Sequence, residues 1–226
     1  DFPDPFALKN MAAMADDVAT AIEAGKKIAV FADFDVDGAT SAAVLGRFLR
    51  ACGQEPLIYI PDRLAEGYGP NSAALKKLRE QGADIVLMAD CGTTAHQVIA
   101  DGRALGLDIV ILDHHEAEDT LPPATHLINP KQKGDASGYA VLAACGVSFL
   151  ACVAINSRLK ERGFFARQNL PEPPLKSWLD LVALGTVCDM VPLSGPNRLF
   201  VRAGFAQMAR RENAGVNALC AVAGLK

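Results

Sequence analysis

Acidic side chains and histidines gather in three short segments, each directly after an apolar run. They are Asp33, Asp35 and Asp37 after residues 27–32, Asp90 after 85–89, and Asp113, His114 and His115 after 109–112. Carboxylates that are brought together repel one another, so a fold that gathers them usually holds cations. Asp oxygens with a His nitrogen suit Mn²⁺ or Mg²⁺, and a pair of such ions is a standard device for attack on phosphorus. If the segments meet, the pattern predicts a two-metal site for phosphoester hydrolysis.

Apolar runs alternate with helix-like stretches along the first half of the chain. We expect strands at 27–32, 57–60, 85–89 and 109–112, a fifth opening at Leu127 and Ile128, and helices at about 16–24, 40–50, 72–82 and 94–105. This alternation predicts an α/β fold with a parallel sheet of about five strands flanked by helices. Ligands of such sheets bind beyond the carboxyl ends of the strands. The acidic segments stand at those ends, so we expect them to converge.

The chain becomes mainly helical after Tyr139. We expect helices at about 140–162, 177–186 and 197–210, with a proline-rich connector at 169–174. The apolar stretch 140–155 contains Gly146 and Ser148 and is shorter than the roughly 20 residues of a membrane span. It is typical of a buried core helix, so we expect no membrane association.

Composition narrows the classes of function. The net charge is −4, which argues mildly against nucleic acid as a partner, although bound divalent cations would reverse the local charge. The six cysteines form no C-x-x-C pair, which indicates reduced, buried thiols in a cytoplasmic protein. The start of the chain at Asp1 resembles no signal peptide, and without an initiator Met we expect a piece of a longer protein.

Four segments resemble, in order, the leading motifs of the DHH phosphoesterase superfamily: FADFDVDGATSAAVL, MADCGT, ILDHH and ALGTVCDMVPL. PDRLAEGYGPN at 61–71 and NRLFVRAG at 197–204 resemble the RecJ family of single-strand-specific exonucleases within it. The resemblance covers nearly the whole chain. It implies a two-metal-ion phosphodiesterase, acting as a 5′–3′ exonuclease on single-stranded DNA in recombination and repair, and leaves Mn²⁺ or Mg²⁺ undecided.

The resemblance also implies roles for single residues. Asp35 would bind the first ion, Asp37, His114 and Asp189 the second, and Asp90 would bridge the two. Some relatives supply a His to the first ion where this chain has Phe31, so that ligand is absent and Asp33 is its natural substitute. The catalytic set would be Asp35, Asp37, Asp90, His114, His115 and Asp189.

Substrate contacts are expected around that set. By the resemblance, His115 would face the scissile phosphate or orient a ligand, and Asp113 would act on ligand orientation without contacting the metal itself. Arg63 and Arg198 are candidate phosphate clamps, since a guanidinium grips phosphate through two parallel hydrogen bonds. Tyr68 is a candidate base-stacking residue. A solvated Arg and a packing Tyr remain the alternatives.

The resemblance suggests a division at about residue 195. Residues 1–195 would form the catalytic domain, and 196–226 would start a helical linker to a missing second lobe, whose glycine-rich motif has no counterpart after Asn197. We therefore expect the isolated chain to bind metal but to cleave DNA slowly or not at all. The family further suggests a monomer, with single-strand-binding protein or a helicase as candidate partners.

Three other functions compete. A different enzyme of the same superfamily would act on short oligonucleotides, cyclic dinucleotides or pyrophosphate with the same metal chemistry. A haloacid-dehalogenase-like phosphatase would use residues 35–40 as a nucleophile loop, but it would leave 113–115 without a purpose. A scaffold that has lost activity is disfavoured because all the expected ligands are present.

Overall fold

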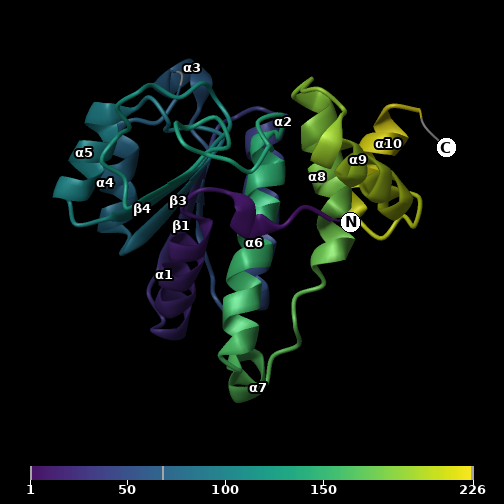
Figure 1. The fold of residues 1–226 in the computed structure, drawn as a ribbon, viewed down its shortest axis with the longest axis horizontal. Helices are drawn as coiled ribbons and strands as arrows, with labels where there is room; N and C mark the ends of the chain where they lie inside the picture. The colour runs from purple at the N-terminus through teal and green to yellow at the C-terminus, as the bar shows by residue number, and fades with distance from the viewer. Residues whose placement is uncertain (1, 68, 225–226) are drawn as a thin grey trace.

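Five parallel strands form the centre of the computed structural model, which describes residues 2–67 and 69–224. The strands are β1 (Ile28–Ala32), β2 (Leu57–Tyr59), β3 (Ile85–Ala89), β4 (Asp108–Leu112) and β5 (His126–Ile128). Their order across the sheet is β2-β1-β3-β4-β5 (Figure 1). The predicted α/β class and the five-stranded parallel sheet are therefore confirmed.

Both faces of the sheet are covered, which explains why the central strands β1 and β3 are apolar and buried at every position. Three helices cover one face, where Val30 and Leu87 point: α1 (Met11–Glu23), α2 (Val36–Ala51) and α6 (Ala144–Glu161). Two helices cover the other face, where Phe31 and Met88 point: α4 (Ser72–Glu80) and α5 (His96–Ala104).

Additional helices form a third layer beyond α2 and α6. Helix α8 (Leu179–Cys188) packs against α2 and α6, and α9 (Gly195–Met208) packs against α8 (Figure 1). The short segments η1 (Pro5–Ala7), α7 (Phe164–Gln168), η2 (Leu175–Trp178) and α10 (Ala214–Val222) complete the mainly helical remainder. No described helix has the length and apolarity that crossing a membrane would demand.

Helix boundaries differ from the prediction where capping decides them. Helix α2 begins at Val36 and not near residue 40, because the Asp35 side chain caps it by accepting a 3.0 Å hydrogen bond from the Gly38 amide. Part of the predicted loop 61–71 is a short helix, α3 (Arg63–Glu66), which Asp62 caps in the same way. The predicted start of α6 at residue 140 is also wrong, since the helix begins at Ala144.

The strand order creates a crevice at the carboxyl edge of the sheet. From β1 the chain moves outward to β2, then returns to place β3 on the other side of β1. The loops after β1 and β3 therefore leave in opposite directions. This topological switch point is where ligands bind in open α/β sheets.

Candidate metal centre

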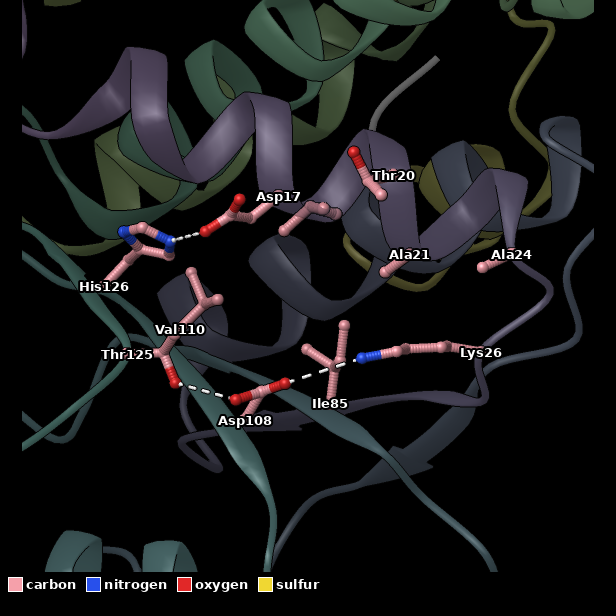
Figure 2. Close-up of a pocket in the computed structure, with 11 residues that line it drawn as sticks. Asp17, Thr20, Ala21, Ala24, Lys26, Ile85, Asp108, Val110, Thr125 and His126 are labelled. Carbon is pink, nitrogen blue, oxygen red and sulfur yellow. Dashed lines mark hydrogen bonds and ion pairs between the residues drawn. The ribbon is translucent and has the colours of Figure 1, made fainter.

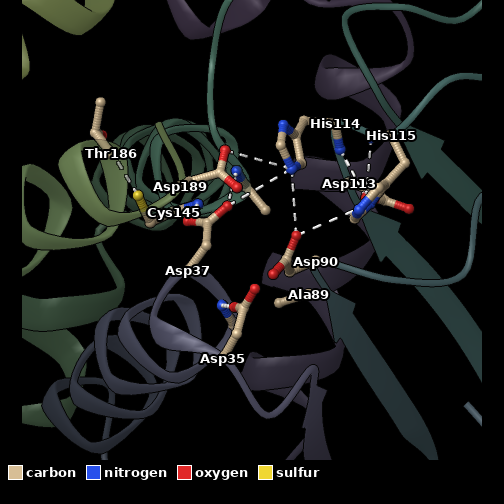
Figure 3. A network of polar contacts seen from close by, with 12 residues as sticks. Asp35, Asp37, Ala89, Asp90, Asp113, His114, His115, Cys145, Thr186 and Asp189 are labelled. Atoms are coloured by element: carbon tan, nitrogen blue, oxygen red, sulfur yellow. Dashed lines mark hydrogen bonds and ion pairs between the residues drawn. The ribbon is translucent and has the colours of Figure 1, made fainter. Parts of the chain in front are cut away.

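Carboxylates and a histidine from four parts of the chain meet at the switch point (Figure 3). Asp33 and Asp35 follow β1, and Asp37 lies in the first turn of α2. Asp90 follows β3, His114 follows β4, and Asp189 caps the C-terminus of α8. The structure thus brings together the six side chains proposed as ligands from the sequence.

Two groups of ligand atoms that share no residue are close enough to hold a cation each, and a third group, of Asp90, His114 and His115, overlaps with both. Oxygens of Asp37 and Asp189 and a nitrogen of His114 lie within 4.8 Å of one another, and so do oxygens of Asp33, Asp35 and Asp90. His114 Nε2 lies 3.4 Å from Asp90 Oδ1, 3.7 Å from Asp189 Oδ2 and 3.8 Å from Asp37 Oδ2. Asp90 therefore adjoins both groups.

The acidic groups of the cluster are poorly suited to being charged without a counterion. Burial, followed by the charges of Asp37 and Asp35, raises the pKa of Asp90 to about 10. Burial also raises the pKa of Asp33, Asp37 and Asp189 above their usual range. Bound cations would remove this penalty, because an opposite charge nearby favours the ionised carboxylate.

Unpaired buried atoms provide the test of whether these residues fit metal ions. Asp90 Oδ1, Asp189 Oδ2 and both ring nitrogens of His114 are buried and have no hydrogen-bond partner among the described residues. Buried polar atoms are normally paired, so each exception calls for an explanation. Oxygen and imidazole donors that face one another match the preferences of Mn²⁺ and Mg²⁺. The residues present fit a pair of such ions.

Backbone amides hold Asp37 in place. The Ala144 amide donates a 2.7 Å hydrogen bond to Asp37 Oδ2, and the Cys145 amide donates a 2.8 Å bond to Asp37 Oδ1. These amides belong to the first turn of α6, whose dipole favours a negative charge. Asp37 is thus fixed by an element more than a hundred residues away in sequence.

The neighbouring His115 is oriented by a buried hydrogen-bond network. Asp113 Oδ1 lies 2.7 Å from His115 Nδ1, and Asp113 Oδ2 accepts a bond from the Thr93 amide. Asn129 donates to His115 O at 2.8 Å and to Thr93 Oγ1 at 3.0 Å. No role was predicted for Asn129 or Thr93, although Asn129 follows β5 at the same sheet edge as the acidic segments.

This network lowers the pKa of Asp113 and raises that of His115. Burial alone would raise the pKa of Asp113, but hydrogen bonds from His115 and Thr93 hold it well below its usual range. The same Asp113 hydrogen bond raises the pKa of His115. The His115 ring is half-exposed and lies beside Asp90, with Nδ1 3.9 Å from Asp90 Oδ1.

Tight turns bring the ligands inward. Asp90 adopts a left-handed φ of 63°, which is uncommon for a residue with a side chain and typical of functional sites. At Gly38 a Cβ would lie 2.2 Å from the Asp33 carbonyl oxygen, so only glycine lets α2 start this close to β1. The backbone conformation of Asp90 and the glycine at position 38 thus help to place the ligands close together.

The expected substrate residues are less tightly gathered. The Arg63 guanidinium stacks over Phe34, 4.5 Å from the ring centroid, and its charge lowers the raised pKa of Asp33. Arg198 is exposed on α9 and has no contact with the cluster among the described residues. Tyr68 lies outside the described residues. Phe31 is buried in the core and stacks on Tyr59, so it lies away from the ligands.

A separate cavity of about 280 Å³ lies between α1 and the start of β4 (Figure 2). Its polar side chains are paired with each other: His126 with Asp17 at 2.7 Å, and Lys26 with Asp108 at 3.7 Å. Paired groups offer a ligand little, so the carboxylate cluster is the better candidate site.

Comparison with known proteins points to one family. The model of the DHH family, N-terminal domain, matches residues 27–186. The single-stranded-DNA-specific exonuclease RecJ of Bacillus subtilis is 35% identical over 99% of this chain and 27% of its own length. RecJ of Escherichia coli is 36% identical over 90% of this chain and 36% of its own length.

Solved structures of RecJ proteins are also similar to this chain. A crystal structure of exonuclease RecJ bound to manganese superposes with a TM-score of 0.81 and 32% identity, covering 96% of this chain and 52% of that one. RecJ from Thermus thermophilus in complex with Mn²⁺ has a TM-score of 0.76 and 29% identity, covering 97% of this chain and 30% of that one. The chain spans about a third of the length of the curated relatives it matches.

Proposed function

Because this chain belongs to the DHH family, we propose that it is the catalytic domain of a RecJ-like, metal-dependent exonuclease that hydrolyses single-stranded DNA from the 5′ end. The observation that carries the proposal is the cluster of Asp33, Asp35, Asp37, Asp90, His114 and Asp189 at the switch point of the sheet. Strand polarity and a role in recombination and repair rest on the similarity to RecJ alone.

We propose two ion sites, one for each of the two groups of ligand atoms that share no residue. We assign one ion to Asp37, His114 and Asp189 and the other to Asp33, Asp35 and Asp90, with Asp90 between them. Mn²⁺ or Mg²⁺ is the proposed metal, since RecJ relatives have been crystallised with each. Two such ions, when bound, polarise the phosphoryl oxygens, activate water and stabilise the leaving oxygen.

The chain's other residues would position the phosphodiester. His115, whose ring is held by its contact with Asp113 and lies beside Asp90, is placed to contact the scissile phosphate. Arg63 stands near Asp33 and is suited to grip a neighbouring phosphate. We retain Tyr68 and Arg198 as proposed substrate contacts on the motif resemblance.

The wider organisation is also a proposal. We assign residues 1–195 to catalysis and 196–226 to the start of a linker, and we expect a monomer that works with single-strand-binding protein or a helicase. A cytoplasmic location follows from the proposed DNA substrate. The six free cysteines are compatible with a reducing compartment.

The proposed function is tested by Mg²⁺- or Mn²⁺-dependent degradation of end-labelled DNA with excess protein. We expect slow release of nucleotides from the 5′ end of single strands, little attack on duplex, and a loss of roughly 100-fold or more in Asp90→Asn, since even residues that only support metal ligands give 10–100-fold effects. Asp119→Asn, a change at an exposed carboxylate, is the matched control. Hydrolysis of dinucleotides but not of longer strands would favour another enzyme of the family.

A further inference from the structure

An apolar groove adjoins the carboxylate cluster on the side of the helical layer. It is lined by Phe34 and Val36 at the start of α2, by Leu181 and Leu184 of α8, and by Leu219 of α10. Asp35 also lines it, and it is the only charged residue among the described residues that do so. We call it the Phe34 groove.

Three apolar side chains of the Phe34 groove are exposed, although apolar side chains are normally buried on folding. Phe34 is 39% exposed, Val36 41% and Leu219 59%. Grouped exposed apolar side chains mark interaction sites more often than isolated ones do. The position of this group beside proposed metal ligands indicates that its partner is the molecule on which the metal centre acts.

The stacking of Arg63 on Phe34 narrows the chemistry of that partner. The guanidinium carbon of Arg63 lies 4.5 Å from the centroid of the Phe34 ring. The planar guanidinium group therefore extends the flat surface of that ring. Nucleobases stack on aromatic rings and on guanidinium planes without needing a particular sequence. A planar base beside Phe34 would leave Arg63 able to reach the phosphate attached to it.

We propose that the Phe34 groove binds a nucleobase of the DNA strand, one or two nucleotides from the phosphate at the metal centre. This rests on the proposed function, because Asp35 belongs both to the groove and to the group of Asp33, Asp35 and Asp90. That shared residue makes the groove continuous with the path of the strand. A second copy of the chain, the rival occupant, would not explain the position beside Asp35.

An abasic scan tests the proposal. The affinity of the chain for a short oligothymidylate with cleavage-resistant phosphorothioate linkages is measured in Mg²⁺ by fluorescence anisotropy, with one base at a time replaced by an abasic site. We expect one position where base removal weakens binding about five-fold or more. In Phe34→Ala and in Leu219→Ser, removal of the base at that position should no longer weaken binding. Leu219 lies far from the metal ligands in sequence.

Controls separate this proposal from the proposed function. Phe205→Ala removes another exposed phenylalanine, 53% exposed on α9, and should keep the full penalty. A penalty that persists in both groove variants overturns the groove alone. No binding of any strand by the unaltered chain overturns the proposed function and the groove with it. Groove variants that only convert a dimer to a monomer in sedimentation would assign the groove to self-association and overturn the proposal.

Discussion

Asp90 is held in a place where its own charge is unfavourable. It is 2% exposed, its φ is 63°, and the charges of Asp37 and Asp35 add to the effect of burial on its pKa. A protein retains such a residue when a ligand compensates for it. Cations shared with the neighbouring ligands are that compensation in the present account.

The pH dependence of metal binding follows from this residue. The folded, metal-free chain holds a proton on Asp90 up to a pKa of about 10, far above the usual 3.8, so the stability from this group is full below pH 4 and falls as pH rises toward 10. A metal must displace the proton. We therefore expect the Mg²⁺ affinity to increase between pH 7 and 8.5, by up to about tenfold per pH unit for each proton released. Calorimetry at several pH values measures it.

Asp90→Asn is the matched control for that measurement, because an amide has no proton to exchange in this range. We expect its remaining Mg²⁺ affinity to be low and its pH slope to be reduced. An unchanged slope would show that Asp90 is not the group that loses the proton.

Asn129 is a positioning residue in this account, because it acts through His115. Asn129→Asp replaces the amide donor to His115 O and Thr93 Oγ1 with an acceptor. We expect kcat to fall by roughly 10–100-fold and its pH profile to shift, while Mg²⁺ affinity stays within about two-fold. Asn217→Asp loses an exposed bond to a backbone carbonyl and serves as the control. Thr93→Ser keeps the hydroxyl and should retain activity, so its failure would argue against the network.

At the scale of elements, the close packing of α8 against α2 and α6 positions residues of the candidate metal centre. Gly185 of α8 allows this, because a Cβ there would lie 2.2 Å from Thr40 Oγ1 and 2.7 Å from Cys145 Sγ. Helix α8 ends at Asp189, and Cys145 also donates its amide to Asp37. The distance of α8 from α2 and α6 therefore sets the positions of Asp189 and Asp37.

Gly185→Ala should push α8 outward. We expect a loss of about 1–3 kcal/mol in the free energy of unfolding, as in other overpacked cores, and weaker Mg²⁺ binding. Gly215→Ala in α10 meets its nearest atom at an ordinary 3.5 Å and should be neutral or slightly stabilising. Denaturant unfolding and calorimetry give both quantities. Equal Mg²⁺ affinity in the two variants would contradict the role assigned to α8.

The predictability of the fold and site also differs between elements. Strands β3 and β4 were predictable because each is an apolar run that is followed directly by polar residues. Parallel strands end at the same edge of the sheet, so Asp90 and His114 could be placed together at that edge. The short helix α10 was not, since it has nine residues, of which only Val216 is buried, and the Asn213 side chain caps it. Asn129 was missed because an Asn before a proline is typical of a turn. Its partners come from two other loops, which only the fold brings near.

For the molecule as a whole, the acidic composition makes nucleic-acid binding dependent on metal. The chain carries a net charge of −4, and its candidate site adds buried carboxylates to it. We expect a chelator to lower the affinity for single-stranded DNA at least tenfold and Mg²⁺ to restore it, because the cations reverse the local charge. Anisotropy titrations measure this. Equal affinity with and without Mg²⁺ would place DNA binding elsewhere.

The most direct measurement is the anomalous scattering of a crystal of the chain soaked in Mn²⁺. We expect two peaks about 3.5–4 Å apart, one among Asp37, His114 and Asp189 and one among Asp33, Asp35 and Asp90, with Asp90 contacting both. Saturating Mn²⁺ with no peak at these residues, or with one ion bound elsewhere, would contradict it.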